Sequence, residues 1–213
     1  MSVVLIAIIV ATILFSYKGF EDMAFFRKYE FHIGSIRAGD QIRMFSSAFL
    51  HADMAHLAFN MLTLYFFAPT VIDYFGSFFF VIVYLGSLLF GSLLTLYLHK
   101  NDYSYRAIGA SGAVTGVLYA AILLQPDNEI YLFFIPIGIP GYIFGIAYML
   151  YAIYGMKAKN DNIGHAAHFG GAIGGYIITL SKAPYLFVDN TFIVGLLAVP
   201  IFILFGMAKT GRI

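Results

Sequence analysis

The sequence predicts an all-α protein that crosses a lipid bilayer several times. Of its 213 residues, 61% are apolar and only 11% are charged, whereas soluble globular domains are about 45–50% apolar and about 25% charged. The charged residues are confined to short segments, and a helix needs ~20 apolar residues to cross the ~30 Å hydrocarbon core of a bilayer. Seven charge-free stretches approach or exceed this length: 1–17, 54–72, 74–99, 107–126, 130–156, 162–181 and 190–208.

The composition also excludes several classes of protein. A net charge of +1 without a basic cluster excludes a nucleic-acid-binding protein, and the apolar content excludes a disordered chain. Because cysteine is absent, the chain has no disulfide framework, no thiolate metal site and no cysteine nucleophile.

The first stretch, 1–17, lacks the basic start and the cleavage site of a signal peptide, so we expect it to be a retained span. The long connection after it, 18–53, mixes aromatic and basic residues. That mixture favours a segment lying in the membrane interface, with its aromatic side chains toward the lipid. A small soluble cap packed on the helices is the alternative.

The stretch 107–126 predicts a helix too short to cross the bilayer alone. Its start, Gly109-Ala110-Ser111-Gly112, is typical of a turn that leads into a helix, and Pro126 ends the helix after about 14 residues. Such a helix is tolerated only where other helices surround it and its end meets a water-filled cavity. We therefore expect Ser111 at a helix N-terminus inside the bundle.

The remaining stretches are predicted as helices that pack on this short one or anchor the chain. Two prolines in 130–156 indicate an extended start, with the helix beginning near Pro140 or Gly141. The stretch 162–181 contains two interleaved GxxxG pairs, which permit close approach between helices. The last stretch, 190–208, is almost wholly apolar and is expected to be a plain anchor helix.

Polar residues inside the spans are costly, so each is a candidate functional residue. His56 and Asn60 lie four residues apart on one helix face, and His165 and His168 lie three apart on another. His51 comes just before the second span. Gly171 and Gly175 share a face with His168, so this helix can press against the one that begins at Ser111. A serine within reach of a histidine is the minimal activated nucleophile.

Each of these residues also has a structural interpretation. A serine in a membrane helix usually bonds its own backbone, and a single histidine often bridges helices. The histidine pair His165 and His168 could bind a metal ion, with His51 and His56 completing its ligands. The absence of carboxylates and thiolates from the spans argues against a metal site or a metal transporter.

Three motifs resemble those of the rhomboid intramembrane serine proteases. Gly109-Ala110-Ser111-Gly112 resembles their GxSG nucleophile motif, and His51, His56 and Asn60 have the spacing of their HxxxxHxxxN motif. The run from Ala167 to Gly175 resembles their AHxGGxxxG motif. Order, spacing and loop lengths agree over 1–181. The resemblance therefore implies a six-helix bundle over 1–181, with an additional C-terminal transmembrane helix in 182–213 (a 6+1 arrangement).

The resemblance also implies a role for each residue. Ser111 is the nucleophile and His168 the base, which form a dyad because no carboxylate lies in a span. His56, Asn60 and Gly109 belong to the oxyanion and substrate-binding site, and Gly112, Gly171 and Gly175 to the helix packing. We expect His51, His165 and Thr115 to line the cavity. The family often has an aromatic residue four positions after the serine; Thr115 stands there, so we expect it to bond His168 instead.

The function implied is an intramembrane serine endopeptidase, whose partners are transmembrane protein substrates and the lipid bilayer. It needs no metal and no organic cofactor. The alternative is a catalytically silent relative that binds the transmembrane helices of client proteins, which usually lacks the serine or the histidine. We expect a multi-pass protein of the cell (plasma) membrane.

The two arguments about orientation disagree. The family places its N-terminus in the cytoplasm, which would leave 11 of the 12 Lys and Arg residues outside and only Lys182 inside. The positive-inside rule predicts the reverse. We expect the orientation of the family, against the charge count.

Overall fold

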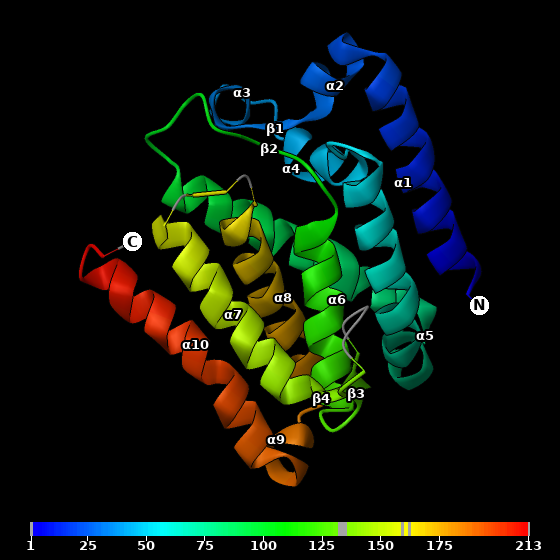
Figure 1. Ribbon diagram of the computed structural model, residues 1–213, viewed down its shortest axis with the longest axis vertical. Coiled ribbons are helices and arrows are strands. Elements are labelled where there is room, and N and C mark those ends of the chain that lie inside the picture. Colours follow the sequence, from blue (N-terminus) through cyan, green and yellow to red (C-terminus); the bar gives the residue numbers. More distant parts are fainter. Residues whose placement is uncertain (1, 132–135, 159, 162, 213) are drawn as a thin grey trace.

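The computed structural model describes residues 2–131, 136–158, 160, 161 and 163–212. Its described part is a bundle of helices with a folded cap at one end (Figure 1). The elements are α1 (Val3–Glu21), α2 (Met23–Tyr29), β1 (Phe31–His32), α3 (Ile33–Arg37), α4 (Arg43–Ser46), a 3-10 helix (Ser47–Phe49), α5 (Met54–Leu98), β2 (Arg106–Ala107), α6 (Ser111–Leu124), β3 (Glu129–Ile130), β4 (Ile139–Pro140), α7 (Gly141–Ala158), α8 (His165–Lys182), α9 (Leu186–Asp189) and α10 (Thr191–Lys209).

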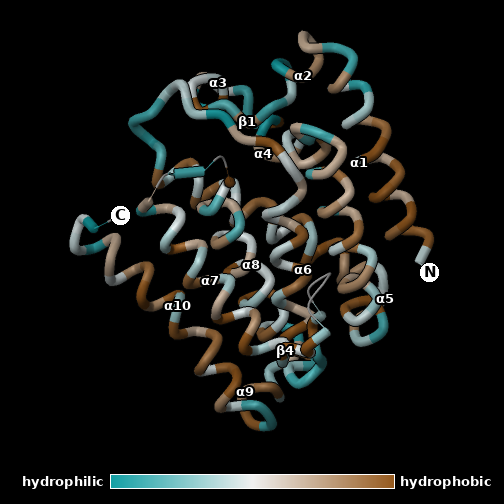
Figure 2. The backbone as a smooth tube through the Cα atoms, in the orientation of Figure 1, coloured by the Kyte–Doolittle hydropathy of each residue, from teal (hydrophilic) through white to brown (hydrophobic). Residues whose placement is uncertain are grey.

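The predicted spans correspond to the long helices of this bundle. The second and third form one continuous element, α5, which is kinked at Gly76, where the backbone adopts a φ of 81° that suits glycine. Helix α6 has 14 residues and begins at Ser111, as predicted, and α7 begins at Gly141. By length and apolar composition, α1, α5 and α10 could each cross a membrane. Figure 2 shows α1 and α10 as mainly hydrophobic.

The connection after α1 differs from the predicted segment 18–53. Helix α1 continues to Glu21, so the connection starts later, and its residues fold into a cap. The cap has a small core of its own, made by Phe31, Ile33, Ile36 and Met44. The helices of this stretch are too short to show the hydrophobic periodicity by which a helix can be predicted. The cap therefore has the packed core expected of the alternative interpretation, while Met23 and Ile42 remain exposed on it.

A buried carboxylate ties the cap to the chain just before α6. Strand β1 pairs with β2, which aligns His32 with Arg106. The Glu30 side chain is only 3% exposed and forms ion pairs with Arg27 and Arg106. Arg43 also donates hydrogen bonds to the backbone carbonyls of Arg27 and Glu30, at 2.8 and 3.1 Å. These contacts hold β2 in place four residues before Ser111.

Glycines bring α5, α6 and α8 together at the centre of the bundle. A Cβ added at Gly171 of α8 would lie 1.9 Å from the carbonyl oxygen of Gly112, and one at Gly175 would lie 2.0 Å from that of Gly116. On the other side, a Cβ at Gly91 of α5 would lie 2.6 Å from the carbonyl oxygen of Ala167. The three backbones are therefore in direct contact, and every residue of α6 after Ser111 is buried.

Replacing Gly171 with alanine is expected to destabilise the bundle, because the new methyl group meets backbone atoms that cannot rotate away. Overpacking of this kind typically costs about 1–3 kcal/mol of the free energy of unfolding. The thermal midpoint of the detergent-solubilised Gly171→Ala protein should fall. Gly195→Ala is the matched control, because nothing lies within 4 Å of its added Cβ. Equal midpoints for the two variants would contradict the close packing of α8 on α6.

Candidate active site

A sharp turn places Ser111 at the first residue of α6. Gly109 has a φ of 113°, in the left-handed region that favours glycine, and its N–H donates to the carbonyl of Ser47 at 2.9 Å. The next N–H, of Ala110, donates to Nε2 of His51 at 3.3 Å. The first N–H groups of a helix have no acceptor within that helix. The Ser111 side chain therefore lies beside N–H groups that can bind an anion.

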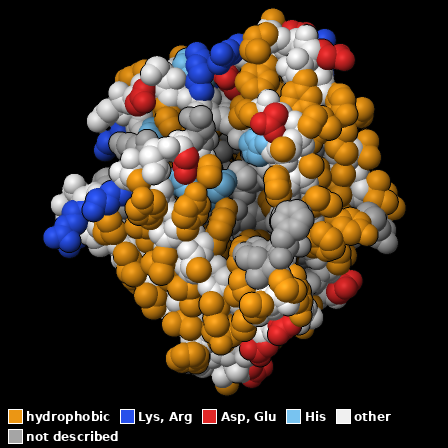
Figure 3. Space-filling model, in the orientation of Figure 1, with side chains coloured by type: hydrophobic (Ala, Val, Ile, Leu, Met, Phe, Trp, Pro, Cys, Tyr) orange, Lys and Arg blue, Asp and Glu red, His pale blue; other side chains and the backbone are white. Residues whose placement is uncertain are grey.

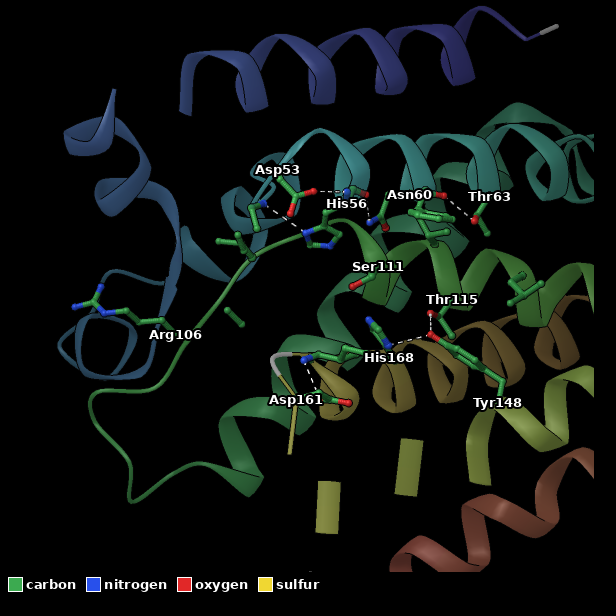
Figure 4. A pocket seen from close by; sticks show the side chains of 18 of the residues that line it. Asp53, His56, Asn60, Thr63, Arg106, Ser111, Thr115, Tyr148, Asp161 and His168 are labelled. Atoms are coloured by element: carbon green, nitrogen blue, oxygen red, sulfur yellow. Dashed lines mark hydrogen bonds between the residues drawn. The ribbon is translucent and has the colours of Figure 1, made fainter. Parts of the chain in front are cut away.

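Ser111 opens into a cavity of about 790 Å³ between α5, α6, α7 and α8. His56 and Asn60 reach this cavity from α5, Thr115 from α6, Tyr148 from α7 and His168 from α8 (Figure 4). Figure 3 shows the surface hollowed here, with histidine side chains at the edge of the hollow. Asp161, Ile163 and Gly164 also line the cavity. The connection between α7 and α8 thus forms part of its wall.

Gly109 makes room for His56. A Cβ at Gly109 would lie 2.8 Å from both Cε1 and Nε2 of the His56 ring, and 3.7 Å from Oγ of Ser111. The imidazole therefore reaches the turn beside the serine only because residue 109 lacks a side chain. This differs from the oxyanion-site role predicted for Gly109, since its N–H is already bonded to Ser47.

His56 and Asn60 each have a polar hydrogen to offer a ligand. Nδ1 of His56 accepts the N–H of Ala52 at 3.4 Å, which leaves Nε2 as the protonated nitrogen of a neutral ring. Nδ2 of Asn60 donates one hydrogen to the carbonyl of His56 at 3.0 Å. An amide nitrogen carries two hydrogens, so the second is available.

The hydrogen-bond partner of His168 is Tyr148, which could not be identified from the sequence. The Tyr148 hydroxyl lies 2.9 Å from Nδ1 of His168, and the two rings are stacked with centroids 6.0 Å apart and an angle of 20°. Thr115 contacts the Tyr148 hydroxyl at 3.5 Å. The predicted bond from Thr115 to His168 is therefore wrong: the link between them runs through Tyr148, because α7 inserts a tyrosine between the two side chains.

Ser111 and His168 face the same cavity, but no hydrogen bond joins them in the part of the chain that the structure describes. Among the described residues, the only hydrogen bond to the imidazole is at Nδ1. In serine hydrolases without substrate, the nucleophile and its base are often separated more widely than a hydrogen bond allows. The arrangement is compatible with a dyad that closes when substrate binds.

His165 does not line this cavity, which corrects its predicted position. Its Nε2 lies 3.0 and 3.1 Å from the two carboxylate oxygens of Asp161, and its ring packs edge-on against Tyr151. It lines a second cavity of about 490 Å³ on the other side of the connection. The N–H of Ile163 lowers the pKa of the Asp161 carboxyl, which keeps it charged beside His165. Although His165 lies one turn before His168 on the same helix, its contacts with Asp161 and Tyr151 keep its ring out of the cavity.

His51 is buried behind the site and also does not line the cavity. Because its Nε2 accepts the Ala110 N–H, its Nδ1 carries the proton and donates to Oγ of Ser16 at 2.9 Å. Ser16 in turn donates to the carbonyl of Phe49 at 2.9 Å. His51 thus connects α1 to the turn before Ser111. With both nitrogens of His51 engaged, the alternative four-histidine metal site loses a ligand, and the described residues contain no cluster of three or more metal-ligating side chains.

Burial of His51 predicts that the fold is acid-sensitive. Desolvation, aided by the neighbouring His56, lowers the pKa of His51 from 6.5 to about 3. In the unfolded chain His51 is protonated below pH 6.5, whereas in the folded chain it stays neutral down to about pH 3. The free energy of unfolding therefore has its full value above pH 6.5 and decreases as the pH falls toward 3. The thermal midpoint should drop between pH 7.5 and 4.5. His51→Gln should lower the midpoint at pH 7.5 but flatten this decline; an unchanged decline would contradict the assignment.

Comparison with known proteins identifies the family of the chain. The family model described as "Rhomboid domain" matches residues 38–184. The chain is 29% identical to "RHOMBOID-like protein 12, mitochondrial" of Arabidopsis thaliana, over 76% of the chain and 52% of that protein. It is 32% identical to "Putative rhomboid protease YdcA" of Bacillus subtilis, over 66% of the chain and 67% of that protein. The chain spans about half the length of the Arabidopsis relative and 40% of "Rhomboid protein 1, mitochondrial" of Saccharomyces cerevisiae.

Proposed function

The chain belongs to the rhomboid family, and we propose that it is an intramembrane serine endopeptidase that hydrolyses peptide bonds in or near transmembrane segments of membrane-protein substrates. One observation carries this proposal. Ser111, at the start of a helix buried in the bundle, and His168, on the helix whose glycines press against it, face one cavity that polar side chains help to line. That arrangement gives a nucleophile, a base and water a common space inside the helix bundle.

In the proposed reaction, Oγ of Ser111 attacks the scissile carbonyl while Nε2 of His168 takes the hydroxyl proton. His168 then gives this proton to the leaving amine, and a water molecule hydrolyses the acyl-enzyme by the same steps. The negative oxygen is met by the Ser111 N–H, by Nε2–H of His56 and by the free amide hydrogen of Asn60. The positive end of the α6 dipole adds a favourable field.

We propose the 6+1 arrangement for the fold, with the protease core in 1–181 and an additional transmembrane helix in 182–213. The additional helix is α10, whose Leu197 packs against Gly145 of α7. The resemblance to the family suggests single-span substrates that are cut at small residues in a segment that unwinds easily. Asp161 and Ile163, which line the cavity, would move to admit them.

The chain is a multi-pass membrane protein. The sequence-based assignment to the cell membrane is not supported by the comparisons, because several relatives are named as mitochondrial proteins. The proposal therefore specifies a lipid bilayer and no particular membrane of the cell.

A second candidate function is that of a silent relative that binds client transmembrane helices without cutting them. The observation that favours it is the missing hydrogen bond between Ser111 and His168 in the described structure. Both functions use the same cavity, so binding alone does not distinguish them.

The test is a cleavage assay with purified protein reconstituted in liposomes. Single-span substrates that differ in small residues and helix-breaking residues within the span are added, and the new termini are identified by mass spectrometry. We expect one principal cut, in or next to the span, that survives a metal chelator. Stable co-purification of uncut substrates across the whole series would support the silent relative instead.

A further inference from the structure

We propose that Tyr148 is a positioning residue for the base: its oxygen accepts a hydrogen bond from Nδ1–H of His168, and its hydroxyl donates a hydrogen bond to Thr115. This inference rests on the proposed function, since it concerns the base of the same dyad. The serine and histidine motifs alone do not determine which nitrogen of His168 carries the proton in the resting enzyme.

The geometry places the three groups in a chain across three helices, α6, α7 and α8. Nδ1 of His168 is 2.9 Å from the Tyr148 hydroxyl, and that hydroxyl is 3.5 Å from Oγ1 of Thr115 (Figure 4). The Tyr148 and His168 rings are also stacked. Tyr148 thus contacts the imidazole at its Nδ1 edge, with its ring nearly parallel to the imidazole ring. The opposite edge, Nε2, has no partner within the described residues and remains for Ser111.

The direction of the first hydrogen bond decides whether His168 can act as a base. A neutral imidazole has one N–H and one acceptor nitrogen. If the Tyr148 hydroxyl donated to Nδ1, the ring proton would sit on Nε2 and the nitrogen facing Ser111 could not accept a proton. If Nδ1–H donates to the Tyr148 oxygen, Nε2 is free to accept. Only the second arrangement serves catalysis.

Thr115 offers the Tyr148 hydroxyl an acceptor for its hydrogen, which the second arrangement requires. A hydroxyl has a single hydrogen, so a Tyr148 hydroxyl that donates to Thr115 presents only its lone pairs to His168. A threonine four residues after the nucleophile thus takes part in positioning, one side chain removed from the base. The aromatic stacking that position 115 does not provide is supplied from α7.

During the reaction the tyrosine keeps its proton. The Ser111 proton moves to Nε2 of His168 and then to the leaving amine, while Nδ1–H stays bonded to the Tyr148 oxygen. When the ring carries its transient positive charge, that hydrogen bond becomes charge-assisted and strengthens. Tyr148 therefore stabilises the charged intermediate more than the resting state, and this raises kcat rather than substrate affinity.

Tyr148→Phe separates the contribution of the hydroxyl from that of the aromatic ring, because phenylalanine keeps the ring and removes only the hydroxyl. We expect kcat to fall about tenfold, corresponding to the loss of one hydrogen bond in the transition state, with KM unchanged. Tyr154→Phe is the matched control on the same helix, since the Tyr154 side chain is 60% exposed, and it should retain the wild-type rate. Full kcat in a folded Tyr148→Phe protein would overturn the proposal.

Thr115→Val tests the direction of the hydrogen bond. Without its acceptor, the Tyr148 hydroxyl is free to donate to Nδ1, which puts the proton on Nε2 and lowers kcat. In that background Tyr148→Phe removes the competing donor, so the double variant should be no slower than Thr115→Val alone. Losses that multiply in the double variant would show two independent effects and contradict the chain of hydrogen bonds.

Nitrogen-15 NMR of histidine-labelled protein reads the tautomer without any substrate. The wild type should show His168 protonated on Nδ1, and Thr115→Val should shift it toward Nε2; an Nε2-protonated wild type would overturn the proposal even if no substrate were known. Failure of the proposed function has a different signature: the wild type would neither cleave nor react with an active-serine probe, whatever the tautomer of His168.

Discussion

The Ser111→Ala and His168→Ala proteins are expected to lose cleavage of transmembrane substrates almost completely. In serine proteases of another fold, removing the nucleophile or the base lowers kcat by about 10⁶, and removing both costs little more. The same non-additivity should hold here, because a serine without its base and a base without its serine are equally unable to start the reaction.

The measurement is the initial rate of product formation in liposomes at matched protein concentration. Ser181→Ala serves as the control, since Ser181 is exposed and its hydroxyl donates to the carbonyl of Ile178 within its own helix. It should cleave at the wild-type rate. A His168→Ala protein that retained most of its activity would show that another group activates Ser111, and the dyad would have to be abandoned.

Loss of either oxyanion donor should produce the next largest effect. Removing one such donor typically lowers kcat by about 10²–10³. We expect this range for His56→Ala and for Asn60→Ala, because both side chains face the cavity with a free polar hydrogen. His56 should show the greater loss, since its ring lies against Gly109, beside Oγ of Ser111.

The same liposome assay, run over a range of substrate concentrations, separates the two possible roles. Transition-state stabilisation predicts a fall in kcat with little change in KM. Phe66→Ala, on the exposed face of α5, is the control and should leave both constants unchanged. A raised KM with normal kcat for His56→Ala and Asn60→Ala would place these residues in substrate binding instead.

The features that could be predicted from the sequence depend on local chemistry. The absence of charge over about 20 residues marks a span wherever it occurs, so the long helices were identified within a few residues at their ends. The short length of α6 could be predicted because Gly109 favours a turn just before the helix and Pro126 ends it, and both effects are local to the chain. The approach of α8 to α6 followed from glycines at helical spacing, because nothing else in those helices allows backbones to touch.

The features that were missed depend on contacts between distant segments. Tyr148 is one of several tyrosines on α7, and nothing in its spacing separates it from those that face outward; the only signal was the threonine at position 115. The histidines His51 and His165 were expected in the cavity because their polarity is visible in the sequence, whereas their partners Ser16 and Asp161 belong to other elements. The cap core formed by Phe31, Ile33, Ile36 and Met44 likewise depends on pairing with β2.

Labelling with a fluorophosphonate probe tests the central claim, that Ser111 is an activated nucleophile, most directly. The probe forms a covalent bond to a serine oxygen with loss of fluoride, and intact-mass analysis counts the adducts on detergent-solubilised protein. We predict a single adduct on the wild type and on Ser181→Ala, located on Ser111, and none on Ser111→Ala or His168→Ala. A folded wild type that takes up no probe, or an adduct that persists in Ser111→Ala, would contradict the account.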